Sequence, residues 1–298
     1  MAISRTQLVK ELEPGLNALF GLEYKRYENQ HAEIYVTESS DRAFEEEVML
    51  SGFANAQTKA EGQGVAFDSA QETYTARYTH DTIALAFAIT EEAIEDNLYD
   101  RISSRYTKAL ARSMSNAKQV KAVTPLIDGL PSTDSFDSGD GVSLFNTAHT
   151  TVSGTNVKNT LTTQADLNET SLEQSLIDIA AMTDERGLRI AARGVKMIVP
   201  SANQFTAERL MKSQGRTGTA DNDINAIGSM GMIPQGYRVN NYLTDSDAFY
   251  IITDVPNGMK MFQRAPLKTA MEGDFDTGNV RYKARERYSF GVSDPRGI

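Results

Sequence analysis

The longest periodic hydrophobic pattern in the chain runs from residue 90 to residue 126. Its apolar positions are Ile94, Leu98, Ile102, Tyr106, Leu110, Met114, Ala117, Val120 and Val123. A recurrence every third or fourth residue is the period of an amphipathic helix with one buried stripe. Thr90 can cap this helix, and Glu91 and Glu92 suit its first turn. At 1.5 Å per residue the helix would be roughly 50 Å long, so the pattern predicts a strut that supports another structure.

The residues before this helix predict a long, projecting two-stranded loop. One strand is expected at residues 44–50, and the alternating Thr- and Tyr-rich residues 73–89 predict another. The connecting residues 51–68 offer little to bury, and the turn is expected near Glu61-Gly62-Gln63-Gly64. A lone hairpin is marginal in water, so we expect this loop to lie on another subunit.

The N-terminal residues predict helix and then an extended arm. Residues 4–20 are expected to form one or two short helices, because leucines recur on one face. Pro14 would open the second helix and Gly21 would end it. Residues 22–43 are polar and aromatic with little period, which is typical of an extended arm.

The second half of the chain predicts a loop, an α/β unit and closing strands. Residues 128–165 form the expected loop, and Gly187 lies near the end of the first expected helix. The α/β unit begins at Asp166, and its elements are helices at 172–180 and 201–211, strands at 195–199, 237–240 and 249–253, and a Gly/Asn/Asp-rich loop at 213–232. Residues 259–292 return to strand, so the overall class is α+β.

Composition narrows the possible functions. The 298 residues carry a net charge of −10 and include no cysteine. The missing cysteines exclude disulfides and thiolate metal sites, and the acidic total argues against tight DNA binding by the whole surface. The sequence shows no apolar run of membrane-spanning length and no signal-peptide pattern near its start, so synthesis in the cytoplasm is expected.

Catalytic and cofactor motifs are weak, and we predict no catalytic, cofactor-binding or metal residues. His31, His80 and His149 are far apart, and we interpret His80 as a hydrogen-bonded histidine at a strand end. Gly228-Ser229-Met230-Gly231 is only a fragment of a nucleophile elbow. Asp134, Asp137 and Asp140 hint at calcium, but their spacing fails the EF-hand pattern, which favours a solvated loop.

One charged pattern remains informative. Arg281, Lys283, Arg285 and Arg287 alternate along an expected strand, so their side chains share one face. Glu272 and Asp274 on the preceding strand can pair with them. Local pairing and a seam in which a neighbouring subunit supplies carboxylates explain the pattern equally well.

The order of these segments resembles the major capsid protein of tailed bacteriophages, with the Hong-Kong-97-type fold. The stretches that carry the resemblance are GLEYKRYENQHAEIYVTESSDRAFEEEV, KAEGQG with TARYTHDTIALAFAITEEAIEDNLYD, SLFNTAHT, LTTQADLNETSLEQSL with DERGL, and NVRYKARERYSFGVSDPRG. They cover almost the whole chain and are similar to relatives grouped with the Mu-type major head subunit.

The resemblance implies a division of the chain into five segments. They are an N-terminal arm at 1–43, an extended β loop at 44–82, a peripheral domain at 83–164 with its spine helix at 90–126, an axial domain at 165–255, and peripheral strands at 256–298. The subunit interface would then include two groups of residues. These are Lys59, Glu61, Gly62 and Gly64 in the loop, and Arg281, Lys283, Arg285 and Arg287 in the last strand.

The resemblance also implies partners. Copies of the chain would form hexamers and pentamers that close into an icosahedral head around double-stranded DNA, without membrane. A separate scaffolding protein, a portal and decoration proteins would join them, and assembly would take place in the host bacterial cytoplasm. The alternatives are an α/β enzyme that uses residues 165–255 and a phage tube or ring protein. The first lacks a recognisable motif, and the long helix disfavours the second.

Overall fold

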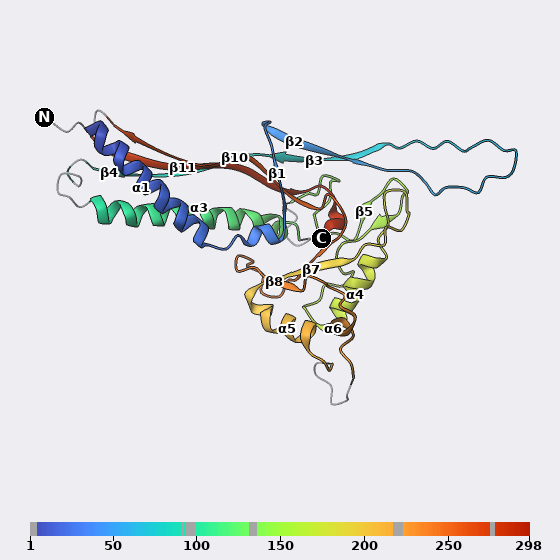
Figure 1. The fold of residues 1–298 in the computed structure, drawn as a ribbon. Coiled ribbons are helices and arrows are strands. Elements are labelled where there is room, and N and C mark those ends of the chain that lie inside the picture. The colour runs from blue at the N-terminus through green and yellow to red at the C-terminus, as the bar shows by residue number, and fades with distance from the viewer. Residues whose placement is uncertain (1–4, 91, 93–98, 131–135, 217–222, 275–277) are drawn as a thin grey trace.

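The fold consists of two lobes and a long projecting loop (Figure 1). The structure is a computed structural model, and it describes residues 5–90, 92, 99–130, 136–216, 223–274 and 278–298. One lobe holds both chain ends and the long helix, and the other is formed by the middle of the chain. The loop leaves the first lobe at the level of its sheet and extends far beyond it (Figure 1).

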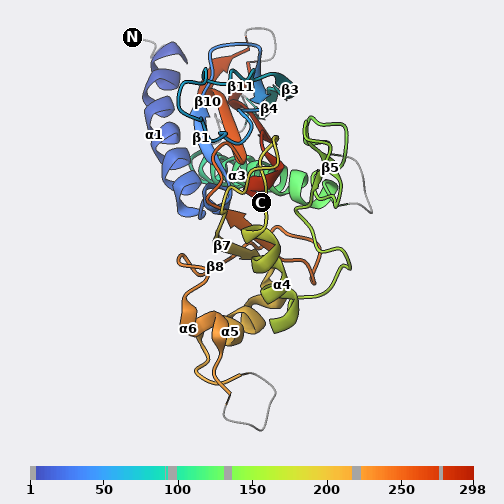
Figure 2. The same cartoon turned by 90° about the vertical axis from the view of Figure 1, so that its right-hand side faces the viewer.

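The first lobe is a four-stranded sheet with two helices packed against one face (Figures 1 and 2). The strand order is β1-β10-β11-β4, in which β1 is parallel to β10 and the other pairs are antiparallel. The elements are α1 (Arg5–Arg26), η1 (Gln30–Glu33), β1 (Val36–Ser39), β4 (Asp81–Ile89), α3 (Tyr99–Asp128), β10 (Met259–Gly273), β11 (Val280–Val292) and η3 (Pro295–Gly297).

The predicted long helix is confirmed from Tyr99 and runs to Asp128, two residues beyond the expected end. Of its predicted first turns, Glu91, Ile94 and Leu98 lie outside the described residues. The expected stripe is wrong at Tyr106 and Val120, whose side chains are exposed. The buried positions are instead Ser103, Thr107, Leu110, Ala111, Met114, Ser115, Lys118, Gln119, Ala122, Val123 and Leu126. Several of these are polar, so apolar periodicity placed the buried face about one position off.

The N-terminal segment differs from its prediction. The helix α1 continues through Pro14 and Gly21 as one helix, because Leu16 and Phe20 are buried against α3 and β11. Residues 22–43 are not extended throughout: they finish α1, form η1 and then pair β1 with β10 in register from Val36.

The extended loop has the predicted form. Its strands β2 (Phe44–Leu50) and β3 (Glu72–Thr79) are antiparallel, and no strand occurs between them. The expected continuous strand at 73–89 is wrong, because it divides at His80. Beyond that residue β4 belongs to the sheet of the first lobe.

The second lobe is a three-stranded sheet with helices around it. Its strand order is β8-β7-β9. The elements are α4 (Glu169–Ala180), β7 (Gly194–Val199), η2 (Ser201–Asn203), α5 (Gln204–Lys212), α6 (Ala226–Met230), β8 (Tyr237–Val239) and β9 (Tyr250–Thr253). These confirm the predicted α/β unit, although α6 occupies part of the expected 213–232 loop. Asn168 and Ser171 form a capping box that starts α4, while Gly187 lies in a later turn. The short pair β5 (His149–Thr150) and β6 (Asn156–Val157) interrupts the expected 128–165 loop.

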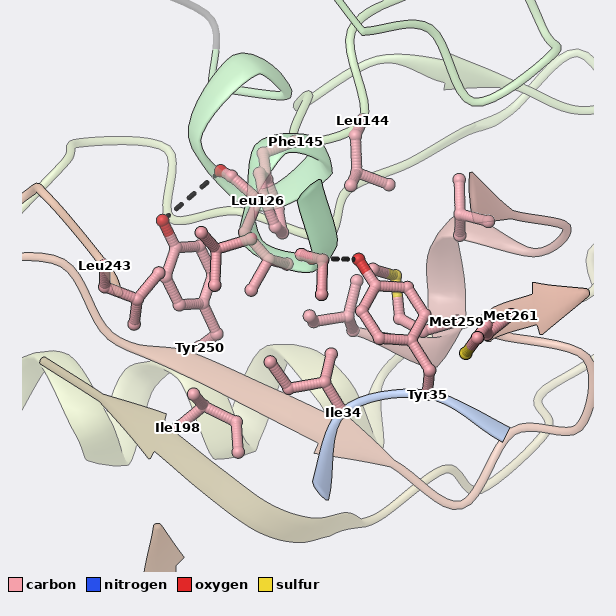
Figure 3. Close-up of a cluster of buried hydrophobic side chains, with 14 of the residues drawn as sticks. Ile34, Tyr35, Leu126, Leu144, Phe145, Ile198, Leu243, Tyr250, Met259 and Met261 are labelled. Carbon is pink, nitrogen blue, oxygen red and sulfur yellow. Dashed lines mark hydrogen bonds between the residues drawn. The ribbon is translucent and has the colours of Figure 1, made fainter. Parts of the chain in front are cut away.

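The lobes share one hydrophobic core at their junction (Figure 3). It joins Leu126 at the end of α3, Tyr35 and Met261 of the first lobe, and Ile198 and Tyr250 of the second. The Tyr35 hydroxyl donates to the carbonyl of Ala122 at 2.6 Å, and the Tyr250 hydroxyl donates to the carbonyl of Leu126 at 3.3 Å. The last turns of α3 therefore connect both lobes. Within the described part of the chain, every helix is too short or too polar to span a bilayer.

Candidate subunit interface

The extended loop presents apolar side chains to solvent. Leu50, Phe53 and Val65 are each more than 60% exposed, and Phe67 is 98% exposed. Residues 53–71 are exposed without interruption, so this part of the loop has no core of its own. Large apolar groups gathered on a projecting segment typically mark a contact surface for another molecule.

The predicted interface residues at the loop tip are all exposed. Lys59, Glu61, Gly62 and Gly64 surround a tight turn in which Gln63 N–H donates to the carbonyl of Ala60 at 3.2 Å. Gly62 has a φ of +80°, a backbone conformation that favours glycine. Within the described residues Lys59 and Glu61 form no ion pair, so the fold leaves their charges available to a partner.

A buried polar network fixes the base of the loop to the first lobe. Lys260 lies 2.5 Å from Glu47 of β2 and 3.2 Å from Glu38 of β1, and it is almost fully buried. Glu47 also accepts a hydrogen bond from Ser293, which lies 2.5 Å from the hydroxyl of Tyr78 on β3. Both strands of the loop are therefore held at their base. Farther along, Arg186 of the second lobe contacts the Asp68 carboxylate and the Ser69 carbonyl, whereas residues 55–67 form no hydrogen bond or ion pair with any described residue outside the loop.

Tyr78 is packed against a glycine at this base. A Cβ added to Gly291 would lie 2.6 Å from Cε1 of Tyr78. Burial raises the pKa of Tyr78 well above its usual value, which keeps the hydroxyl protonated. The aromatic ring also contacts Phe262 edge-on, with centroids 4.8 Å apart.

We expect Gly291→Ala to destabilise the subunit by about 1–3 kcal/mol, because the added methyl group overpacks the site against a ring that cannot move freely. Gly273→Ala is the matched control, since it is also in a strand but has open space around it. Urea unfolding of both variants measures the difference. Equal midpoints for the two variants would show that the Tyr78 contact is not tight.

His80 sits where the chain passes from the loop into the sheet. Its Nε2 lies 2.9 Å from Ser40 Oγ, and its Nδ1 lies 3.0 Å from Ser289 Oγ. Because the Ser40 hydroxyl donates to Glu45 at 2.7 Å, His80 Nε2 carries the proton in the contact with Ser40. Burial, with the nearby charge of Arg287, lowers the pKa of His80. The residue is thus a hydrogen-bonded histidine at a strand end, as predicted, and does not activate Ser40 as a base would.

The predicted basic stripe is present on β11. Arg281, Lys283 and Arg285 are exposed and Arg287 is half-buried, on the sheet face that points away from the helices. Asp274 pairs with Arg281 as predicted, and Glu272 lies opposite Arg281 in the register. Within the described residues Lys283 and Arg285 have no ion-pair partner. Their neighbours on β4 are small, because Ala84 and Ala86 lie opposite them.

The structure does not bring the two predicted groups of interface residues together within one chain. The loop tip projects away from the end of the sheet that carries the stripe (Figure 1). Contact between them would therefore require a second copy.

The acidic loop is only partly described, because Asp134 lies outside the described residues. Asp140 is not solvated, which corrects its prediction. It lies 2.6 Å from His149 Nδ1 and accepts from Ser138 at 2.6 Å. These contacts fix the Asp140 carboxylate within the loop. Among the described residues no group of three or more His, Asp or Glu side chains is arranged to bind a metal.

Sequence reasoning missed the buried ion pairs, and two of them join segments that are far apart in the sequence. Lys118 of α3 lies 2.5 Å from Glu286 of β11, and Arg296 near the C-terminal end lies 2.6 Å from Glu185 of the second lobe. A signal for the first was present, because Glu286 occupies an inward position between Ala284 and Tyr288. Nothing in the sequence identified its partner.

Comparisons with known proteins point in one direction. A family model described as "Phage capsid protein" matches residues 72–298. A search of curated proteins found no match. The fold is similar to a virus-like particle from Pyrococcus furiosus, with 9% identity, 95% of each chain covered and a TM-score of 0.51. It is also similar to the capsid of Myoviridae Phage XM1, with 10% identity over 88% of this chain and 87% of that one and a TM-score of 0.53. The procapsid of bacteriophage JBD30 matches with 13% identity over 97% and 73% of the respective chains and a TM-score of 0.52.

Proposed function

The chain belongs to the phage capsid protein family and is a major capsid protein with the Hong-Kong-97-type fold, and we propose that its hexamers and pentamers close into an icosahedral head. The head would enclose double-stranded DNA, and a scaffolding protein, a portal and decoration proteins would act with it in the host cytoplasm. Heterologous contacts between identical subunits close into rings when the rotation between them allows it.

Each segment of the chain would form a different part of the capsid subunit. Residues 83–164 and 256–298 would form the peripheral domain, with α3 as its spine, and residues 165–255 the axial domain near the ring centre. Residues 1–43 would contribute an N-terminal arm, although α1 and β1 pack on their own lobe. Residues 44–82 would reach across to the adjacent subunit.

The observation that carries the proposal is the extended loop. It exposes Phe53, Val65 and Phe67 on a segment that the subunit holds at its base and, through Arg186, at Asp68 and Ser69. Burying such side chains against a neighbour stabilises the assembly by roughly 25 cal/mol per Å² of apolar surface. In this arrangement the tip residues Lys59 and Glu61 lie on the adjacent subunit, and the β11 stripe receives carboxylates from another copy.

We expect the full-length protein, expressed with its neighbouring genes, to form hollow shells or capsomer rings. Negative-stain microscopy and size-exclusion chromatography measure this directly. A protein that stays monomeric with and without those genes at micromolar concentration would contradict the proposal.

A further inference from the structure

The solvent-facing side of α3 is basic, although the chain as a whole is acidic. Residues 101–127 contain six Lys or Arg residues and no Asp or Glu. Two of the six are neutralised by the fold, since Lys118 pairs with Glu286 and Lys121 with Asp81. The exposed cations Arg105, Lys108 and Arg112 form no ion pair with any described residue.

These three cations share one side of the helix. Their spacing of three and four residues places them in one row, which spans about 10 Å along the axis. Lys108 and Arg112 line an open groove of about 580 Å³ between α1 and α3. Its carboxylate, Glu23, accepts a hydrogen bond from Tyr27 at 3.1 Å and lies 3.7 Å from Arg26. The groove therefore retains a net positive charge.

The chemistry of this row fits phosphate better than a protein surface. Ser113 and Asn116, which line the same groove as Lys108 and Arg112, can donate hydrogen bonds to phosphate oxygens. A protein partner typically requires several exposed apolar anchors at the centre of the contact. Among its described side chains α3 exposes the large apolar groups Tyr106 and Val120, and the Tyr106 ring already contacts that of Phe87. Binding to a nucleic-acid backbone requires little more than cations.

We propose that this helix face, defined by Arg105, Lys108 and Arg112, contacts the phosphate backbone of the packaged double-stranded DNA. The inference rests on the proposed function, since it assumes that the chain encloses DNA. The net charge of −10 argues against DNA binding by the whole surface, but the surplus of acidic residues lies outside residues 101–127, and α3 supplies a local basic surface. The contact reads no sequence, which suits a head that must hold any part of a genome.

Three phosphate contacts give a weak, salt-sensitive interaction in each subunit. The slope of log K against log salt would be about −2.7, so affinity would fall roughly 40-fold between 50 and 200 mM salt. Contacts of this strength, repeated over many subunits, retain DNA collectively while each one releases it readily.

The test uses unassembled full-length subunits and a fluorescent 30-base-pair DNA in a salt series. We expect Arg105→Gln/Lys108→Gln/Arg112→Gln to lower the affinity at 50 mM salt at least tenfold and to reduce the magnitude of the salt slope by about 2.7. The matched control is Arg189→Gln/Arg193→Gln/Arg209→Gln, which removes the same charge from exposed cations of the second lobe and should bind as the unmodified chain does. Equal losses in both variants, or no loss in the first, would overturn the proposal.

Shell assembly is scored separately by negative-stain microscopy. The helix-face variant should form normal shells that retain less DNA. If it forms no shells while its free subunits still bind DNA, the face serves a subunit or scaffolding protein instead and the proposal is wrong. Failure of the unmodified chain to form shells would refute the proposed function and leave the binding measurement as an independent result.

Discussion

Deletion of residues 52–66 is expected to leave a folded subunit that no longer assembles. Every residue from 53 to 66 is exposed and belongs to none of the core clusters. The network at the loop base, with Glu47, Tyr78 and Lys260, lies outside the deletion. The remaining residues 67–71 can close a shorter turn, because the entropic cost of closing a flexible loop changes only slightly with its length. Stability of the isolated subunit should therefore change by less than about 1 kcal/mol.

Assembly, unlike stability, should be lost. The deletion removes Phe53 and Val65 and shortens the loop so that it cannot reach an adjacent subunit. We expect no shells by negative-stain microscopy, and an unfolding midpoint in urea close to that of the full chain. A control, Ala60→Ser, keeps the loop length and its large apolar side chains and should assemble normally. Shells of normal yield and size from the deletion variant would show that the loop is not a subunit contact.

Elements set by local periodicity were predictable from the sequence. The helices α3 and α4 and the strand β7 follow from the spacing of apolar residues and from local stop signals such as Pro200. Elements defined by distant pairing were not. The break at His80 divides a run that is strand-like throughout, and it occurs because β3 pairs with β2 while β4 pairs with β11.

The candidate interface was predictable to a similar extent. The loop tip and the β11 stripe carry their own signals, in composition and in charge alternation. The network at the loop base does not, because Glu47 and Ser293 are 246 residues apart in sequence and meet only in the folded chain. The phase of the buried stripe on α3 was missed for the same reason. Lys118 is buried because Glu286 faces it, and apolar periodicity treats a lysine as exposed.

That buried pair provides the largest expected effect on stability. Lys118 Nζ lies 2.5 Å from Glu286 Oε1, with both side chains nearly inaccessible, and 5.1 Å from the centroid of the Tyr288 ring. Glu286 also accepts a hydrogen bond from the hydroxyl of Tyr24 at 3.4 Å. Burial, followed by the charge of Glu286, raises the pKa of Tyr24, so the hydroxyl stays protonated and can donate. The pair thus joins α1, α3 and β11.

Replacement of Glu286 by Ala is expected to lower the free energy of unfolding by about 3–5 kcal/mol, because it leaves the Lys118 ammonium buried without a counter-charge. The double variant Lys118→Met/Glu286→Leu should recover most of this loss, since two apolar side chains of similar volume need no partner. The control Arg281→Ala, on the exposed face of the same strand, breaks a surface ion pair and should cost less than about 1 kcal/mol. Urea unfolding of unassembled subunits at pH 7 measures all three.

If Glu286→Ala costs no more than Arg281→Ala, water reaches Lys118 and the pair does not fix α3 against the sheet. If the single variant is destabilised and the double variant is not, desolvation of an unpaired lysine is the cause.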